Sequence, residues 1–191
     1  MRIVVIDNGG QWTHREWRVL RDLGVESEIV PNTTPLEKIK ADGLVLSGGS
    51  PRVGLNAEAM GKCGEYIDKA DVPVMGICAG HQFMAMHLGG KAGPSKVPEF
   101  GKTLVEIDVE DDIFKGLPPT IVAWESHNDE VTELPPDFIS LAHSDNCTVQ
   151  AMRHKTKPLF GVQFHPEVEH TDNGYEIFQS FADVCQALKK D

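Results

Sequence analysis

The most constraining feature of this sequence is a cysteine with a glycine two residues to either side. Gly76 precedes Cys78 and Gly80 follows it, between an apolar run at 72–77 and a helix-like stretch at 79–88. Glycine at both offsets lets a chain turn tightly from a strand into a helix while the central residue is held in a strained conformation. The pattern predicts Cys78 at the carboxyl end of a strand. Alone, it would also fit a buried structural cysteine.

Strand and helix patterns alternate along the first 90 residues. Strands are expected at residues 1–6, 27–31, 43–46 and 72–77, and helices at residues 11–23, 35–41, 56–70 and 79–88. Such alternation is typical of an α/β fold in which helices cover both faces of a parallel sheet.

Near residue 101 the alternation of strand and helix patterns gives way to short strand patterns separated by turns. Short strands are expected at 103–109, 149–152 and 159–162, separated by Pro and Asp/Asn turns, and a helix is expected at 173–190. This indicates hairpins or a mixed extension of the sheet. We therefore expect one domain over residues 1–191, with an open, mixed, mainly parallel sheet and helices on both faces.

Composition excludes several classes of function. The net charge of −11 argues against binding to a nucleic-acid backbone, and no run of about 20 apolar residues exists to span a membrane. The apolar start is too short for a secretory signal. The four cysteines are widely spaced, without a Cys-x-x-Cys pair, so we expect free thiols, no metal site and a cytoplasmic location.

A second segment supplies what a reactive thiol needs. His165 and Glu167 lie just after the strand expected at 159–162, so they should reach the same sheet edge as Cys78. His165 would accept the thiol proton and later protonate the leaving group, and Glu167 would orient the imidazole. By itself, His-Pro-Glu would more often be a solvated surface turn; the pairing with Cys78 favours catalysis.

A glycine-rich segment follows the third expected strand. Ser47-Gly48-Gly49-Ser50-Pro51 would bring backbone N–H groups to the same edge, because glycine allows close approach to a substrate. A plain turn is the simpler alternative. A phosphate-binding loop is disfavoured, since neither the Walker nor the dinucleotide glycine motif is present.

Together these segments resemble the class I, triad-type glutamine amidotransferases. The matching stretches are Gly76–Gln82, Ser47–Gly49 and Phe164–Glu167. The resemblance implies a flavodoxin-like fold and a glutaminase reaction through a γ-glutamyl thioester on Cys78. It also implies an oxyanion hole formed by the backbone N–H groups of Gly49 and Ala79. Ser50 stands where many members have proline directly after the glycines, which could alter this loop.

The same resemblance implies a glutamine-binding set. The residues that would hold the α-amino and α-carboxylate groups are Gln82 and a loop made of Ser126, His127, Asn128 and Asp129. Residues 7–11, 30–35, 126–129 and 165–171 are similar to one branch of the family, the glutaminase part of GMP synthetases.

This branch implies a partner and locates the cofactors. No Ser-Gly-Gly-Val-Asp-Ser pyrophosphatase loop follows, so we expect a separate XMP-adenylating subunit to receive the ammonia, as in the archaeal form. ATP and Mg²⁺ are expected on that subunit and no cofactor in this chain.

Three alternative functions remain open. They are an amidotransferase subunit for another acceptor, a free-standing γ-glutamyl hydrolase on the same fold, and a non-catalytic regulatory subunit. The intact Cys78, His165 and Glu167 argue against the last.

Overall fold

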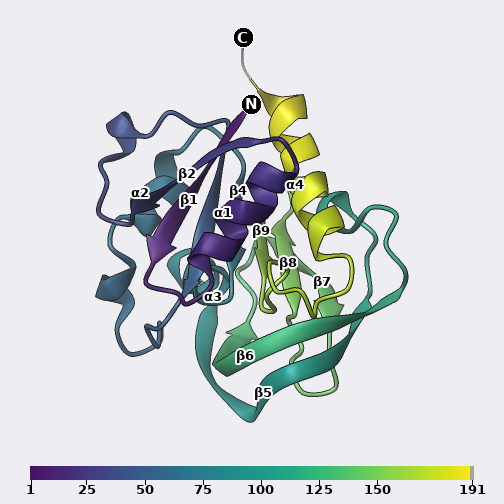
Figure 1. Cartoon of the computed structure of the whole chain (residues 1–191). Helices are drawn as coiled ribbons and strands as arrows, with labels where there is room; N and C mark the ends of the chain where they lie inside the picture. Colours follow the sequence, from purple (N-terminus) through teal and green to yellow (C-terminus); the bar gives the residue numbers. More distant parts are fainter. Residues whose placement is uncertain (190–191) are drawn as a thin grey trace.

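A nine-stranded sheet with the strand order β2-β1-β3-β4-β9-β8-β7-β5-β6 forms the centre of the computed structural model, which describes residues 1–189 (Figure 1). The strands are β1 (Arg2–Asn8), β2 (Glu26–Pro31), β3 (Gly43–Gly49), β4 (Val74–Ile77), β5 (Lys91–Ile107), β6 (Thr120–Glu133), β7 (Phe138–His143), β8 (Ala151–His154) and β9 (Leu159–Val162). The helices are α1 (Thr13–Asp22), α2 (Cys63–Lys69), α3 (Ala79–His87) and α4 (Gly174–Leu188), with short 3-10 turns η1 (Leu36–Lys38), η2 (Ala57–Met60) and η3 (Asp112–Phe114).

The sheet has a parallel part and an antiparallel part. Strands β2, β1, β3, β4 and β9 run parallel in the flavodoxin-like order, and β8, β7, β5 and β6 continue the sheet with antiparallel pairs. The expected open, mixed sheet with a parallel core is confirmed. Figure 1 shows β5 and β6 as a long curved hairpin at one end of the molecule.

Two separate cores lie on the two faces of the parallel part. Along β1, Ile3 and Val5 pack in the cluster that contains residues of α1 and α4, whereas Val4 and Ile6 pack in the cluster that contains residues of α2 and α3. Successive side chains of a strand point to opposite faces, so a continuous apolar run fills both cores. The longest described helix is the 15-residue α4, and no helix within residues 1–189 is long and apolar enough to cross a membrane.

Two helix predictions are corrected by the structure. The helix expected at 56–70 is divided into η2 and α2, because Gly61 between them has a φ of +54° that breaks the helical path. The helix expected at 35–41 is only the turn η1. Of the helix expected at 173–190, the structure has Gly174–Leu188; residue 190 lies outside the described residues.

The antiparallel strands are longer than their sequence suggested. The strand expected at 103–109 is the end of the 17-residue β5, whose pairing with β6 shifts register between Pro94 and Glu99. Residues 126–129, expected as a loop, lie within β6. Two prolines and two glycines in β5 are typical of turns, and only the bulged pairing with β6 accommodates them in a strand.

Candidate active site

Strand register brings the predicted catalytic segments together. Strand β4 lies between β3 and β9, with Gly76 paired to Leu46 on one side and Ile77 paired to Val162 on the other. The N–H of Cys78 donates to the carbonyl of Val162 at 2.8 Å. The chain segments that follow β3, β4 and β9 therefore meet at one edge of the sheet, as expected for a site of this fold.

The turn at Cys78 is strained as predicted. Cys78 has φ 48° and ψ −103°, and Asn173 is the other described non-glycine residue with a positive φ. A Cβ atom on Gly76 would lie 2.6 Å from the carbonyl of Gly80, and one on Gly80 would lie 2.2 Å from the carbonyl oxygen of Leu46. Both glycines are thus required for α3 to pack closely on the strands, and this packing fixes the thiol at the amino end of α3.

His165 and Glu167 form a buried pair beside Cys78. His165 Nδ1 lies 2.7 Å from Glu167 Oε1, and both side chains are almost fully buried. Burial by itself lowers the pKa of His165, but the charge of Glu167 and a hydrogen bond with Cys78 outweigh it and raise the pKa well above its usual value. The site therefore favours the protonated form of the His165 imidazole.

The surroundings of His165 fix its position. Its N–H donates to the carbonyl of Trp124, and its carbonyl accepts from Thr171 Oγ1 at 2.7 Å. The ring of Trp12 meets the imidazole edge-on with centroids 4.5 Å apart. The sequence pattern favours core or partner-facing packing for Trp12; the structure places it against the candidate base.

A cavity of about 200 Å³ opens beside the triad. Its lining includes Cys78, His165 and Glu167 together with Gly48 and Gly49 of the predicted oxyanion segment. A Cβ on Gly48 would lie 3.1 Å from His165 Cε1 and 3.8 Å from Cys78 Cβ, so this glycine lets its segment approach the triad closely. Ala79 is the first residue of α3, where backbone N–H groups are free of helical partners.

The residues predicted to bind glutamine divide into two groups. Ser126 lines the cavity. Gln82, His127 and Asp129 are buried and contact one another instead, and Asn128 is exposed on β6. Both carboxylate oxygens of Asp129 accept hydrogen bonds from Arg52, which follows the oxyanion segment, at 3.1 and 2.5 Å. This ion pair joins the oxyanion segment to the hairpin.

A relay of two amides runs from β6 to the thiol. Gln82 Nε2 donates to the carbonyl of Asp129 at 2.6 Å and to Gln163 Oε1 at 3.0 Å, and Gln163 Nε2 lies 3.6 Å from Cys78 Sγ. The amide oxygen of Gln163 accepts the hydrogen bond from Gln82, so its amide nitrogen lies on the other side and directs its protons toward the sulfur of Cys78. The sequence motifs assigned no role to Gln163, although it lies within the Gly-Val-Gln-Phe-His-Pro-Glu segment that identified the base.

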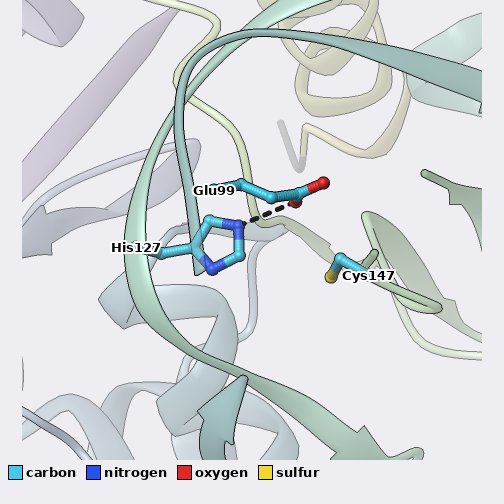
Figure 2. Close-up of side chains that lie close together, drawn as sticks. All are labelled: Glu99, His127 and Cys147. Carbon is cyan, nitrogen blue, oxygen red and sulfur yellow. Dashed lines mark hydrogen bonds and ion pairs between the residues drawn. The ribbon is translucent and has the colours of Figure 1, made fainter. Parts of the chain in front are cut away.

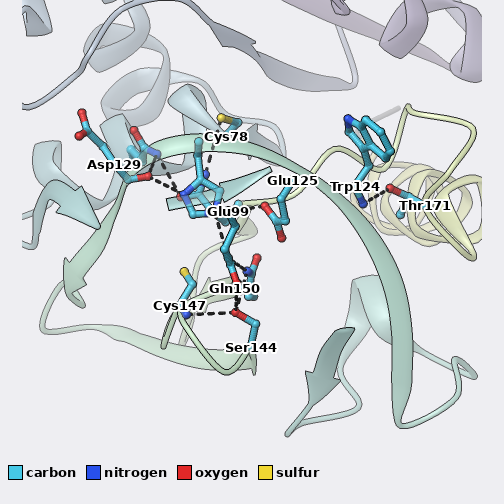
Figure 3. Close-up of polar contacts among 12 residues, drawn as sticks. Cys78, Glu99, Trp124, Glu125, Asp129, Ser144, Cys147, Gln150 and Thr171 are labelled. Carbon is cyan, nitrogen blue, oxygen red and sulfur yellow. Dashed lines mark hydrogen bonds and ion pairs between the residues drawn. The ribbon is translucent and has the colours of Figure 1, made fainter. Parts of the chain in front are cut away.

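A buried polar cluster lies behind this relay. His127 Nε2 lies 3.1 Å from Glu99 Oε2 and 3.3 Å from Glu125 Oε2, and its Nδ1 lies 3.0 Å from the carbonyl of Asp129. Figure 3 shows the network extending from Cys78 to Ser144 and Cys147. Although burial by itself lowers the pKa of His127, its hydrogen bonds to Glu125 and Glu99 raise that pKa to about 10. The imidazolium is the counter-ion of the cluster.

One part of the cluster has the donor types of a metal site. Ligand atoms of Glu99, His127 and Cys147 lie within 4.8 Å of one another, and Figure 2 shows the three side chains close together. Glu99 already accepts hydrogen bonds from Ser144, Gln150 and His127. Burial raises the pKa of the Cys147 thiol. The charge of the imidazolium and these hydrogen bonds to Glu99 together explain why the three side chains lie so close.

The cluster predicts a pH dependence of stability. A histidine whose pKa is raised on folding stabilises the protein fully below about pH 6.5, and this contribution is lost as pH rises toward about 10. Between these limits wild type should lose up to ~1.4 kcal/mol of unfolding free energy per pH unit relative to His127→Gln. Urea unfolding at pH 7, 8, 9 and 10 measures both slopes; parallel slopes would contradict a charged His127.

The fold and this site define a class of protein, and the comparisons agree with it. The glutamine amidotransferase class-I family model matches residues 4–185, and the chain belongs to that family. A protein of Thermoplasma volcanium, named as one subunit of a glutamine-hydrolyzing GMP synthase, is 56% identical over 191 residues, 100% of this chain and 95% of that protein. The protein of the same name from Thermococcus kodakarensis is 50% identical, covering 97% of this chain and all of that protein.

A solved structure is also closely similar. The crystal structure of a GMP synthase subunit from Thermoplasma acidophilum has a TM-score of 0.93 at 51% identity, covering 98% of this chain and 94% of that one. A glutamine amidotransferase of Thermotoga maritima matches at a TM-score of 0.75 and 20% identity, which shows the shared fold.

Proposed function

We propose that this chain is the glutaminase subunit of GMP synthetase. The observation that carries the proposal is the buried Cys78–His165–Glu167 site in a chain that is about half identical, over its full length, to proteins named as a subunit of glutamine-hydrolyzing GMP synthase. The cavity, at about 200 Å³, is below the ~300 Å³ of the smallest drug-sized sites and suits a ligand the size of one amino acid.

The proposed reaction assigns one step to each group of the site. The Cys78 thiolate attacks the side-chain carboxamide carbon of glutamine, and the backbone N–H groups of Gly49 and Ala79 stabilise the oxyanion. His165 protonates the leaving nitrogen, the C–N bond breaks, and ammonia leaves a γ-glutamyl thioester. His165 then takes a proton from water, which attacks the thioester and releases glutamate. Glu167 keeps the imidazolium oriented and charge-compensated throughout.

The proposal includes a second subunit that adenylates XMP and receives the ammonia. The similar proteins are each named as one subunit of their enzyme, which itself implies a further subunit. ATP and Mg²⁺ would act on that further subunit. We also propose a cytoplasmic location, which the four free, buried cysteines support.

The test is glutamate release from glutamine with and without the XMP-adenylating subunit, ATP, Mg²⁺ and XMP. Wild type is expected to show activity that disappears in Cys78→Ala and rises at least about tenfold with the complete mixture, because coupling between sites is commonly worth 1–3 kcal/mol. Cys185→Ala is the control, since burial raises the pKa of that thiol to about 12 and keeps it unreactive.

Two outcomes would overturn the proposal in different ways. Activity that needs Cys78 but ignores the second subunit would favour a free-standing hydrolase or another acceptor. Release of glutamate that persists in Cys78→Ala would remove the triad from the mechanism altogether.

A further inference from the structure

A glutamate without an assigned role lies in the wall of the candidate active site. Glu16, on α1, lines the same cavity as Cys78, His165 and Glu167, and is 1% exposed. Glutamate side chains are rarely buried so completely unless they have a partner. No Lys or Arg side chain within residues 1–189 forms an ion pair with Glu16 that could compensate a buried negative charge.

Glu16 makes one hydrogen bond and leaves one carboxyl oxygen unpaired. Oε1 accepts the backbone N–H of Gly48 at 3.3 Å, while the buried Oε2 has no hydrogen-bond partner. Burial raises the pKa of Glu16 well above its usual value, and the charge of Glu167 and the weaker effect of Asp7 raise it further. The Gly48 N–H and His165 oppose this effect without cancelling it. Burial without a cationic partner, together with the facing charge of Glu167, therefore favours the protonated form of Glu16.

A complementary acceptor lies on the triad itself. Glu167 uses Oε1 to bind His165 Nδ1, and its Oε2 is buried without a hydrogen-bond partner. A protonated Glu16 supplies a donor that lacks an acceptor, and Glu167 supplies an acceptor that lacks a donor, in the same cavity wall. Such charge-assisted O–H···O⁻ bonds are among the strongest in proteins.

We infer that Glu16 is a positioning residue: its protonated carboxyl donates to the free oxygen of Glu167 and accepts the N–H of Gly48. Through these two bonds it couples the orientation of Glu167 to the segment that carries the oxyanion donors. Gly48 already lies against the imidazole of His165, so a shift of this segment would disturb both parts of the site. This inference rests on the proposed glutaminase function.

The first test compares Glu16→Gln and Glu16→Leu in glutamate release with the XMP-adenylating subunit, ATP, Mg²⁺ and XMP. Glutamine can still donate and accept, so Glu16→Gln should keep kcat within about threefold of wild type at pH 7. Leucine can do neither and should lower kcat by about 10- to 100-fold with little change in KM, as expected for loss of a charge-assisted bond. Glu176→Leu, on the exposed surface of α4, is the matched control.

The pH profile separates positioning from packing. As pH rises through the pKa of Glu16, wild type loses the donated proton and gains a second negative charge facing Glu167. The rate of wild type relative to Glu16→Gln should therefore fall as pH rises through that pKa, because an amide does not ionise. Equal loss of rate in Glu16→Gln and Glu16→Leu would overturn the inference, and so would unchanged kcat in Glu16→Leu.

An infrared measurement, which needs no enzymatic activity, tests the protonation of Glu16 separately from the proposed glutaminase function. At pH 6.5, infrared difference spectra of wild type against Glu16→Gln should show the carbonyl stretch of a protonated carboxylic acid, since exposed carboxyls are already ionised at about this pH. Absence of this band would overturn the inference. If glutamate release does not depend on Cys78, the proposed function fails, while the infrared band still decides the protonation of Glu16.

Discussion

Replacing Glu167 by glutamine is expected to lower kcat for glutamine hydrolysis by about 10²- to 10⁴-fold, with KM nearly unchanged. Glu167 Oε1 lies 2.7 Å from His165 Nδ1 in a buried site where solvent cannot replace the lost charge. Without that charge the burial of His165 favours its neutral form, and the thiolate–imidazolium pair loses its stabilisation. The range corresponds to about 3–5 kcal/mol of transition-state stabilisation.

The measurement is steady-state glutamate release with the second subunit present. Glu169→Gln is the matched control, because it makes the same chemical change on an exposed side chain two residues away in the same segment. The role of Glu167 is refuted if Glu167→Gln keeps kcat within about threefold of wild type while Glu169→Gln behaves normally. A fall in both variants would instead point to the negative charge of the whole segment.

Local patterns in the sequence were sufficient to predict those parts of the site that lie directly after a parallel strand. The strand at 159–162 and the elbow at Cys78 were predictable because apolar runs and flanking glycines act within a few residues. The meeting of Cys78 with His165 followed from placing both after parallel strands. These features were confirmed in the strand register.

The missed features depend on contacts between distant parts of the chain. Glu16 reads as an ordinary polar position of a surface helix, and only the packing of α1 beside the oxyanion segment turns it into the cavity. The β5–β6 hairpin was obscured by Pro94 and Pro98, whose tolerance depends on bulged pairing with a partner strand. The ion pair of His127 with Glu99, from across that hairpin, was likewise not indicated by the residues next to either one in sequence.

Replacing Gly80 by alanine is expected to destabilise the fold by about 3 kcal/mol or more and to abolish most activity. The added Cβ would lie 2.2 Å from the carbonyl oxygen of Leu46 and 2.9 Å from its Cβ. A backbone carbonyl in a central strand cannot rotate aside, so α3 must move away from β3. Alanine favours helices by up to ~1 kcal/mol over glycine, which offsets only part of this cost.

The same displacement explains why activity should fall further than stability. Leu46 directly precedes the segment that carries Gly48 and Gly49, while Gly80 lies two residues after Cys78. Separating α3 from β3 therefore moves the nucleophile away from the oxyanion donors, and a shift of about 1 Å can cost on the order of 100-fold in rate.

Gly93→Ala provides the control for Gly80→Ala, because a Cβ at Gly93 meets nothing within 4 Å and its φ is not in the left-handed region. That variant should stay within about 0.5 kcal/mol of wild type. Urea unfolding measures the stability of both variants, and glutamate release measures their activity at a temperature where each remains folded. A Gly80→Ala protein as stable and active as Gly93→Ala would show that the α3–β3 contact does not hold the elbow in place.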